Sequence, residues 1–378
     1  MAAGGGRAPA VVGVILAGGA GTRLWPRSRT ARPKHLLPLA PDGRTLLRHA
    51  FERLRGVADR VLVVTIASQA AAIRAELPEL VPAGADPGAG DAILAEPAPR
   101  GTGPALGWAA LRALALDPRA LMLSVHADHL MPDLDETRAV LTSAVGWAAD
   151  SGGLVTIGVA PAGPATGFGY IELGEELSPG PHGPAHAAHA VRRFVEKPTA
   201  SAAARFLAAG HFRWNTGLFA WRAERFWAEL VAAAPAVATA LQQAVAQEAD
   251  PDAFAGAYAA LDTAPVEPLV LERSRTVICV SAALRWSDLG SWADLHAALQ
   301  AAGEADPDGN VVRGDALVLD SQGCLVDAAG GRTVAVVGGA DLVVIDAGDV
   351  VLVCPRTRSQ AVRQLVDRLR AEGRDTLL

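Results

Sequence analysis

Residues 11–22, VVGVILAGGAGT, place a short apolar run directly before a glycine-rich turn. The run Val11–Ala17 is nearly continuous in β-branched and aliphatic residues, which is typical of a buried strand in a parallel sheet. The glycines that follow allow backbone N–H groups to approach a phosphate closely. Ligands of open α/β sheets bind at the carboxyl ends of the strands. The stretch therefore predicts a first strand that ends in an anion-binding turn.

Apolar runs and helix-like stretches alternate from Val11 to about Pro161. Two connecting stretches, one starting at Thr45 and one around Leu106, carry apolar residues at helical spacing. Apolar strands linked by helices favour a parallel sheet that is covered on both faces. We therefore predict an α/β fold with a Rossmann-like mixed, mostly parallel sheet flanked by helices. The further strand-like runs lie at residues 61–67, 92–96, 120–125 and 154–159.

Beyond residue 161 the sequence predicts further helices. Helical patterns begin at about Ser201 and at Arg225, and the second continues to about Ala249. Ser291 and Asp294 have the spacing of a capping box, which predicts the start of another helix.

From about Asp306 the sequence changes to short apolar runs separated by Gly and Asp. Repeated short strands with turn residues between them favour a small C-terminal β-helix-like domain. A chain of 378 residues accommodates one large domain and a smaller one. We expect residues 1–300 to form the large, catalytic domain and residues 301–378 to form a small β-rich domain that ends in a helix.

Composition excludes several classes of protein. The formal net charge of −6 and the lack of a long basic run argue against nucleic acid as a partner. No apolar run is long enough to span a bilayer, so no membrane association is expected. The three cysteines are far apart and in no metal-binding spacing, which fits a reducing compartment and a cytoplasmic location.

Cations are concentrated just after the glycine-rich turn. Five basic residues occur between positions 23 and 34 with no Asp or Glu among them, and a solvated basic loop is the simplest explanation of such a run. The turn lacks the Gly-Lys-Ser/Thr of a Walker loop, and Leu24 stands where a dinucleotide-binding fingerprint needs Gly. The five cations are Arg23, Arg27, Arg29, Arg32 and Lys34.

The stretch GGAGTRLWPRSRTARPK, residues 18–34, resembles the signature of the sugar-1-phosphate nucleotidyltransferases. Its Trp25-Pro26 continuation resembles the mannose-1-phosphate guanylyltransferase branch, as do NTGLFAW at 215–221 and WSDLGSW at 286–292. Arg27 departs from the pattern where Leu is usual, and His35 departs where Gln is usual. The resemblance implies transfer of GMP from GTP to mannose 1-phosphate, which gives GDP-mannose and pyrophosphate by Mg-assisted in-line attack.

The resemblance also implies which residues bind the nucleotide. Arg23 and Lys34 would neutralise phosphate charge during catalysis, and the turn would wrap the triphosphate. The loop that starts at Glu96 matches the base-side loop of the family, although Gly101 stands where Asn is common. The nucleotide-binding candidates are Gly18, Gly19, Gly21, Thr22, Thr102 and Asp128.

Two carboxylates are candidates to hold Mg²⁺. Asp128 lies just past a buried strand, where a carboxylate can hold Mg²⁺ against nucleotide phosphates. Together with Asp288 it resembles the two-carboxylate Mg²⁺ site of the family. The alternatives are a metallohydrolase-like cluster of Asp128 with His126 and His129, and a simple Asp-containing turn at Asp288.

The sugar-side candidates lie in EKP and RWNTGLFAW. Lys34 and Lys197 are the only lysines in the chain, and a compact ammonium can meet one phosphate oxygen as a point charge. We therefore expect Lys197 to act in catalysis by contacting the sugar phosphate. By resemblance, Glu196 and Asn215 bind sugar hydroxyls, and Gly169 lets the backbone approach the sugar. A strand-end carboxylate paired with an Arg is the alternative for Glu196.

Other functions are distinguished by the same residues. A nucleotidyltransferase for another pair of nucleotide and sugar phosphate would keep the same motifs. A catalytically silent paralogue that senses GDP-mannose would be expected to have lost a metal carboxylate or a phosphate lysine. The sequence keeps both carboxylates and both lysines: Asp128, Asp288, Lys34 and Lys197. A hexapeptide-type acyltransferase would need a catalytic His that the C-terminal segment lacks. The expected partners are GTP and mannose 1-phosphate, and a homodimer is an assembly that the sequence leaves open.

Overall fold

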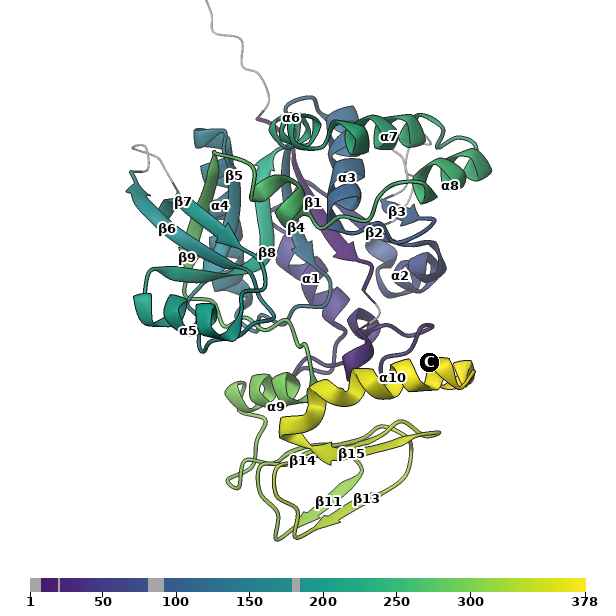
Figure 1. Ribbon diagram of the computed structural model, residues 1–378. Coiled ribbons are helices and arrows are strands. Elements are labelled where there is room, and N and C mark those ends of the chain that lie inside the picture. The colour runs from purple at the N-terminus through teal and green to yellow at the C-terminus, as the bar shows by residue number, and fades with distance from the viewer. Residues whose placement is uncertain (1–7, 20, 81–91, 179–183) are drawn as a thin grey trace, which may run out of the picture. The chain divides into compact units, whose positions relative to one another are not determined.

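The computed structural model describes residues 8–19, 21–80, 92–178 and 184–378 (Figure 1). The chain forms two compact units, each made of three separate segments. The turn after the first strand and the segment around Asp128 both belong to the second unit. The first unit comprises residues 1–18, 51–126 and 133–284, and the second comprises residues 19–50, 127–132 and 285–378.

The first unit is built on one mixed sheet. Among the described residues its strand order is β3-β2-β1-β4-β8-β5-β9-β7-β6. Strands β7 and β8 run antiparallel to their neighbours, and the other strands share one direction. The predicted mixed, mostly parallel sheet is therefore confirmed. The strands are β1 (Val11–Ala17), β2 (Arg60–Ile66), β3 (Ile93–Glu96), β4 (Leu121–His126), β5 (Leu154–Val159), β6 (Tyr170–Leu177), β7 (Ala188–Val195), β8 (Phe212–Arg222) and β9 (Val277–Ala282).

Strand β1 contacts helices on both of its faces because its side chains alternate. Val12 and Val14 join the core that also contains Trp108 of α3 (Thr102–Leu116). Gly13 points the other way, where an added Cβ would lie 2.9 Å from Leu54 Cδ1 of α1 (Leu46–Leu54). The helices of the first core lie together in Figure 1; they are α3, α6 (Ala223–Ala233), α7 (Pro235–Ala246) and α8 (Pro251–Ala259). The predicted cover of helices on both faces is confirmed.

The region after β8 contains two helices where the sequence predicts one. The sequence predicts a single helix from Arg225 to about Ala249, and this prediction is wrong. The region contains α6 (Ala223–Ala233) and α7 (Pro235–Ala246), which are separated by a non-helical Ala234 with φ −145°. A proline has no N–H to donate and disfavours helical geometry in the residue before it, so the helix ends at this point.

The remaining helices of the structure connect or cover the strands. Within the described parts of the chain, no helix combines the length and the apolar character that crossing a membrane requires. Besides the helices of the first core, the structure contains α1 (Leu46–Leu54), α2 (Ala70–Glu76), α4 (Leu134–Ser151), α5 (Ala200–Ala209), α9 (Trp292–Ala301) and α10 (Val362–Ala371).

The C-terminal part of the second unit is a small stack of strands. Strands β10, β12 and β14 pair in parallel, β15 closes that sheet antiparallel to β14, and β11 pairs in parallel with β13. This arrangement confirms the predicted β-helix-like domain. The strands are β10 (Val311–Gly314), β11 (Ala316–Leu319), β12 (Leu325–Ala328), β13 (Val334–Val337), β14 (Leu342–Asp346) and β15 (Val351–Pro355).

Two tryptophans hold the segment after β1 within the second unit. Both are buried in the core of that unit, and Nε1 of Trp292 donates a hydrogen bond to the carbonyl of Trp25 at 3.0 Å. Trp292 is the first residue of α9. The Ser291 hydroxyl caps this helix by accepting from the backbone N–H of Asp294, which confirms the predicted start of the helix.

Candidate active site

Lys34 joins the two segments that carry the predicted metal carboxylates. Its Nζ donates to Asp128 Oδ2 at 2.8 Å and to the backbone carbonyl of Asp288. The Lys34 side chain is only 5% exposed, whereas that of Asp128 is 34% exposed. A buried ammonium must be paired, and these two acceptors supply the pairing. An ammonium has three N–H groups, so these bonds leave a third for another acceptor.

The glycine-rich turn lies directly against Lys34. Gly21 has φ +64°, and a Cβ added there would lie 2.3 Å from Lys34 Cβ. Both the left-handed backbone and the close approach therefore require glycine at this position. The Gly21 carbonyl accepts from the Leu24 N–H at 2.9 Å at the start of the short helix η1 (Thr22–Leu24). The predicted turn and the predicted lysine are neighbours in the fold.

Asp288 lies near Asp128 because their loops pair. Leu130 and Ser287 exchange two backbone hydrogen bonds, at 2.9 Å and 3.0 Å. A Cβ added at Gly290 would lie 3.1 Å from Asp288 Oδ2 and 3.3 Å from Arg23 Nη1, so both side chains lie against this glycine.

The charge balance around Asp288 suits a divalent cation. Burial raises the pKa of Asp288, and the carboxylates of Asp294 and Asp128 add to the rise, while Lys34 and Arg23 oppose it. A cation would relieve the repulsion between two neighbouring carboxylates, and carboxylate oxygens are ligands that Mg²⁺ prefers. Asp128 and Asp288 therefore have the chemistry required of a pair of Mg²⁺ ligands.

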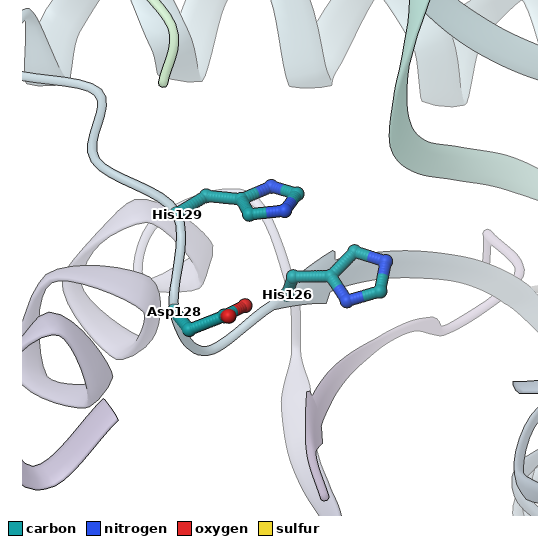
Figure 2. Close-up of side chains that lie close together, drawn as sticks. All are labelled: His126, Asp128 and His129. Atoms are coloured by element: carbon teal, nitrogen blue, oxygen red, sulfur yellow. The ribbon is translucent and has the colours of Figure 1, made fainter. Parts of the chain in front are cut away.

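A second possible set of metal ligands lies on the four residues 126–129. Figure 2 shows His126 at the end of β4 and Asp128 and His129 on the loop that follows, and one ligand atom of each lies within 4.8 Å of the others. Nδ1 of His129 accepts from Trp286 Nε1 at 3.2 Å. His126 lies against Gly217, where an added Cβ would be 2.7 Å from its Nε2. This set keeps the His–Asp alternative open as a place for a divalent ion.

His35 departs from the usual pattern and is buried. Burial lowers its pKa to about 4, and the Lys34 ammonium also lowers it. Among the described residues, its Nε2 has no hydrogen-bond partner. The ring is therefore neutral at physiological pH and adds no charge beside Lys34.

The sugar-side candidates Gly169, Glu196 and Lys197 lie together in the first unit. A Cβ added at Gly169 would lie 2.5 Å from Glu196 Oε2, so a side chain there would move the Glu196 carboxylate from its place. The Glu196 carboxylate pairs with Lys197 at 2.6 Å, rather than with an arginine as in the alternative interpretation. Lys197 has φ +46°, a left-handed conformation that is costly for a residue with a Cβ.

Asn215 is largely engaged by the protein, and one of its partners was missed from the sequence. Its Oδ1 accepts from Thr156 Oγ1 at 2.9 Å, and its Nδ2 donates to Glu267 Oε1 at 3.3 Å. Burial raises the pKa of Glu267, and the Glu196 carboxylate adds to the rise. Glu267 begins a single π-helical turn (Glu267–Leu271), a feature that is frequent at functional sites. A lone Glu beside a proline gives no sequence signal of this kind.

The base-side loop is held by backbone hydrogen bonds to a distant segment. Gly101 has φ +81°, and a Cβ there would lie 2.7 Å from the Ala264 carbonyl oxygen. Thr102 Oγ1 accepts from the backbone N–H of Val266 at 2.9 Å. The Thr102 hydroxyl therefore has a structural partner, and its donor hydrogen is left for other acceptors.

Glu96 is a second residue that sequence reasoning missed. It ends β3, and its Oε1 accepts from the Tyr258 hydroxyl at 2.7 Å. Burial raises its pKa to about 7, although the hydrogen bond from Tyr258 opposes the rise. An added Cβ at Gly18 would lie 3.8 Å from Glu96 Oε2, whereas one at Gly19 would have no described atom within 4 Å. Gly18 thus lies beside a buried carboxyl group at the carboxyl edge of the sheet.

The predicted site residues form two groups, one in each compact unit. The second unit holds Gly19, Gly21, Thr22, Arg23, Lys34, Asp128 and Asp288, and the first unit holds Gly18, Thr102, Gly169, Glu196, Lys197 and Asn215. Within the second unit, Lys34 contacts the Asp128 carboxylate and the backbone carbonyl of Asp288. Within the first unit, Gly169, Glu196, Lys197 and Asn215 are linked by contacts and by the Asn215 N–H to Gly169 carbonyl bond of 2.8 Å.

Two family models match the chain. Residues 12–304 match the family described as Nucleotidyl transferase, and residues 314–369 match the MannoseP isomerase/GMP-like beta-helix domain. The first match covers more than half of the chain, and the second covers the stack of strands in the second unit.

Individual relatives agree with these matches. The mannose-1-phosphate guanylyltransferase of Escherichia coli (strain K12) is 37% identical over 372 residues, which cover 96% of this chain and 74% of the relative. The Xanthan biosynthesis protein XanB of Xanthomonas campestris pv. campestris (strain B100) is 36% identical with the same coverage. A crystal structure described as mannose-1-phosphate geranyltransferase from Thermus thermophilus has a TM-score of 0.79 and 30% identity, and covers 95% of this chain and 99% of that chain. The chain is therefore a sugar-1-phosphate nucleotidyltransferase and belongs to the mannose-1-phosphate guanylyltransferase group of that family.

Proposed function

We propose that the protein transfers GMP from GTP to mannose 1-phosphate and releases pyrophosphate. A phosphate oxygen of mannose 1-phosphate attacks the α-phosphorus of GTP, a new P–O bond forms, and the bond to the β-phosphate oxygen breaks. The attacking phosphate is already ionised at neutral pH, so the reaction needs alignment and charge neutralisation rather than a general base. The observation that carries the proposal is the junction of Lys34 with Asp128 and Asp288 beside the glycine-rich turn.

We assign the phosphates of GTP to the second unit. Arg23 and the third N–H of Lys34 supply positive charge, and the turn with Gly19, Gly21 and Thr22 supplies backbone N–H groups. Mg²⁺ held by Asp128 and Asp288 would neutralise further charge on the phosphates. The position of Asp128 supports this role, because its side chain is 34% exposed and so is accessible to a ligand.

We assign mannose 1-phosphate to the group around Lys197. The Lys197 ammonium is 64% exposed at its side chain and can meet the sugar phosphate, while Glu196 accepts from a sugar hydroxyl. Asn215 has a second N–H on Nδ2, and Glu267 has a carboxylate oxygen beside it, so both can bind hydroxyls. Gly169 leaves room for these groups, because any side chain there would displace Glu196.

We assign the choice of guanine to Glu96, with the Thr102 loop beside it in sequence. The N1–H and the exocyclic amino group of guanine are adjacent donors, and a carboxylate offers two acceptor oxygens in matching geometry. Tyr258 occupies one lone pair of Oε1 and so fixes the carboxyl group in one orientation. Adenine presents an acceptor at N1 in place of this donor, so an ionised Glu96 would disfavour it.

Three further expectations remain proposals. Residues 1–300 form the catalytic domain, and residues 301–378 form the small β-rich domain. The three cysteines are free in the structure, which supports a reducing, cytoplasmic location. A homodimer is the assembly that sedimentation of the purified chain would test.

The first prediction concerns the substrates. Purified protein with Mg²⁺ should release pyrophosphate from GTP and mannose 1-phosphate, and only slowly from ATP, UTP or dTTP or with glucose 1-phosphate. Comparable rates with another pair would keep the family and change the substrates. No turnover with any pair, together with binding of GDP-mannose, would instead identify a sensing paralogue.

The second prediction concerns the ammonium of Lys197. Lys197→Arg should lower kcat/KM for mannose 1-phosphate by about tenfold to a hundredfold, because a wide planar fork replaces a point charge in a charge-assisted hydrogen bond. Arg205→Lys, an exchange of the same two residue types at an exposed position of α5, should leave kcat/KM unchanged. Turnover of Lys197→Arg at the wild-type rate would refute the point-charge argument.

The third prediction concerns the buried carboxyl of Glu96. Its pKa is about 7 in the folded protein against an ordinary value of 4.5, so the folded state holds this proton more tightly than the unfolded state does. The free energy of unfolding of the wild type should therefore fall by about 3 kcal/mol, relative to Glu96→Gln, as the pH rises from about 4.5 to about 7. Urea unfolding at a series of pH values measures this difference.

The control for this experiment is Glu175→Gln at an exposed position of β6. Its unfolding free energy should follow that of the wild type at every pH. If the Glu96→Gln and wild-type curves ran parallel from about pH 4.5 to about pH 8, the carboxyl group would have an ordinary pKa and the account of its burial would be wrong.

A further inference from the structure

The second unit contains a basic pocket that does not include the residues of the candidate active site. The cavity has a volume of about 570 Å³, and its lining includes the guanidinium-bearing residues Arg27, Arg29 and Arg32. The opposite wall is formed by turns of the β-helix-like domain at residues 329 and 347, together with Asp349. All of these residues belong to the same compact unit.

Arg27 is held by a nearly buried ion pair with Asp327. Its Nη1 donates to Asp327 Oδ1 at 2.6 Å, and both side chains are nearly buried. Asp327 also lies in the field of a second guanidinium, that of Arg313. The Asp346 carboxylate lies near the same group, so two guanidinium groups and two carboxylates meet behind the pocket wall. Leu is usual at position 27 in the family pattern, so this cation is a departure of the present chain.

Arg29 is held in a fixed orientation at the mouth of the pocket. It donates to Asp349 Oδ1 at 2.8 Å, to the Pro26 carbonyl at 2.6 Å and to the Leu377 carbonyl at 2.7 Å. Asp349 is half-exposed and is the acid that offsets this charge in the pocket lining.

Arg32 is the third arginine of the pocket lining. It is exposed, and its side chain makes no hydrogen bond or ion pair with any residue that the structure describes. Its backbone exchanges two hydrogen bonds of 3.0 Å with Arg29, which fixes its Cα beside the pocket. Of the three arginines that line the pocket, Arg27 is paired with Asp327 and Arg29 with Asp349, so Arg32 is the one whose charge no ion pair offsets among the described residues.

We propose that this pocket binds the phosphate group of a small phosphorylated molecule at a place separate from the proposed reaction site. Guanidinium groups bind phosphate oxygens in a two-pronged manner, and the pocket lining brings three of them together with a single carboxylate. A volume of about 570 Å³ lies within the range of small-molecule sites and accommodates a hexose phosphate as well as free phosphate. Inorganic phosphate and a phosphorylated sugar share this chemistry.

The experiment is calorimetric titration of the full chain with inorganic phosphate, with glucose 6-phosphate and with glucose. Arg32→Gln should weaken binding of the phosphorylated probes by at least about tenfold, because it removes the cation that has no acid beside it. Arg60→Gln, which removes another exposed arginine at the start of β2, should bind as the wild type does. Circular dichroism checks that both variants are folded.

The arms separate the sources of the phosphate. Equal affinity for inorganic phosphate and glucose 6-phosphate would assign the pocket to free phosphate, and tighter binding of glucose 6-phosphate would assign it to a phosphorylated sugar. Wild-type affinity in Arg32→Gln, no binding of either phosphorylated probe, or equal binding of glucose would overturn the proposal. The readout is binding, so the result does not depend on whether the proposed transfer reaction occurs.

Discussion

The buried ammonium of Lys34 is the interaction on which the candidate site of the second unit depends. It reaches the Asp128 carboxylate and the Asp288 backbone from a third segment of the chain, and so connects three loops that are far apart in sequence. The same side chain sets the conformation of the glycine-rich turn, because only a residue without a Cβ fits against it at Gly21. Removing the Asp128 carboxylate would be costly, since the buried Lys34 ammonium would lose its partner of opposite charge.

The site of the second unit therefore holds cations and carboxylates next to one another before any ligand binds. Burial raises the pKa of Asp288, and the carboxylates of Asp294 and Asp128 add to the rise, while Lys34 and Arg23 oppose it. A nucleoside triphosphate would add the negative charge of its phosphates to the site, and a divalent cation would balance that added charge. In the first unit the logic differs, because Glu196, Glu267 and Asn215 are acceptors and donors of the kind that suit sugar hydroxyls.

The sequence predicts most of the fold because its signals are local. The apolar run Val11–Ala17, the glycines after it and the capping box at Ser291 each specify structure within a few residues. The break between α6 and α7 also has a local signal, because Pro235 cannot continue the preceding helix. Glu96 and Glu267 could not be found in this way. Their environments arise from Tyr258 and Asn215, which lie far from them in sequence, and no spacing pattern encodes such contacts.

The most direct test of the account is whether Asp128 and Asp288 hold one metal ion with the nucleotide. Manganese can replace magnesium at such sites, and its binding can be followed by electron paramagnetic resonance in the presence of GTP. The account predicts one tight Mn²⁺ in the wild type, and affinity at least about tenfold weaker in both Asp128→Asn and Asp288→Asn. Wild-type affinity in Asp288→Asn with loss in His129→Gln would contradict it, and would place the ion on the histidine side of Asp128.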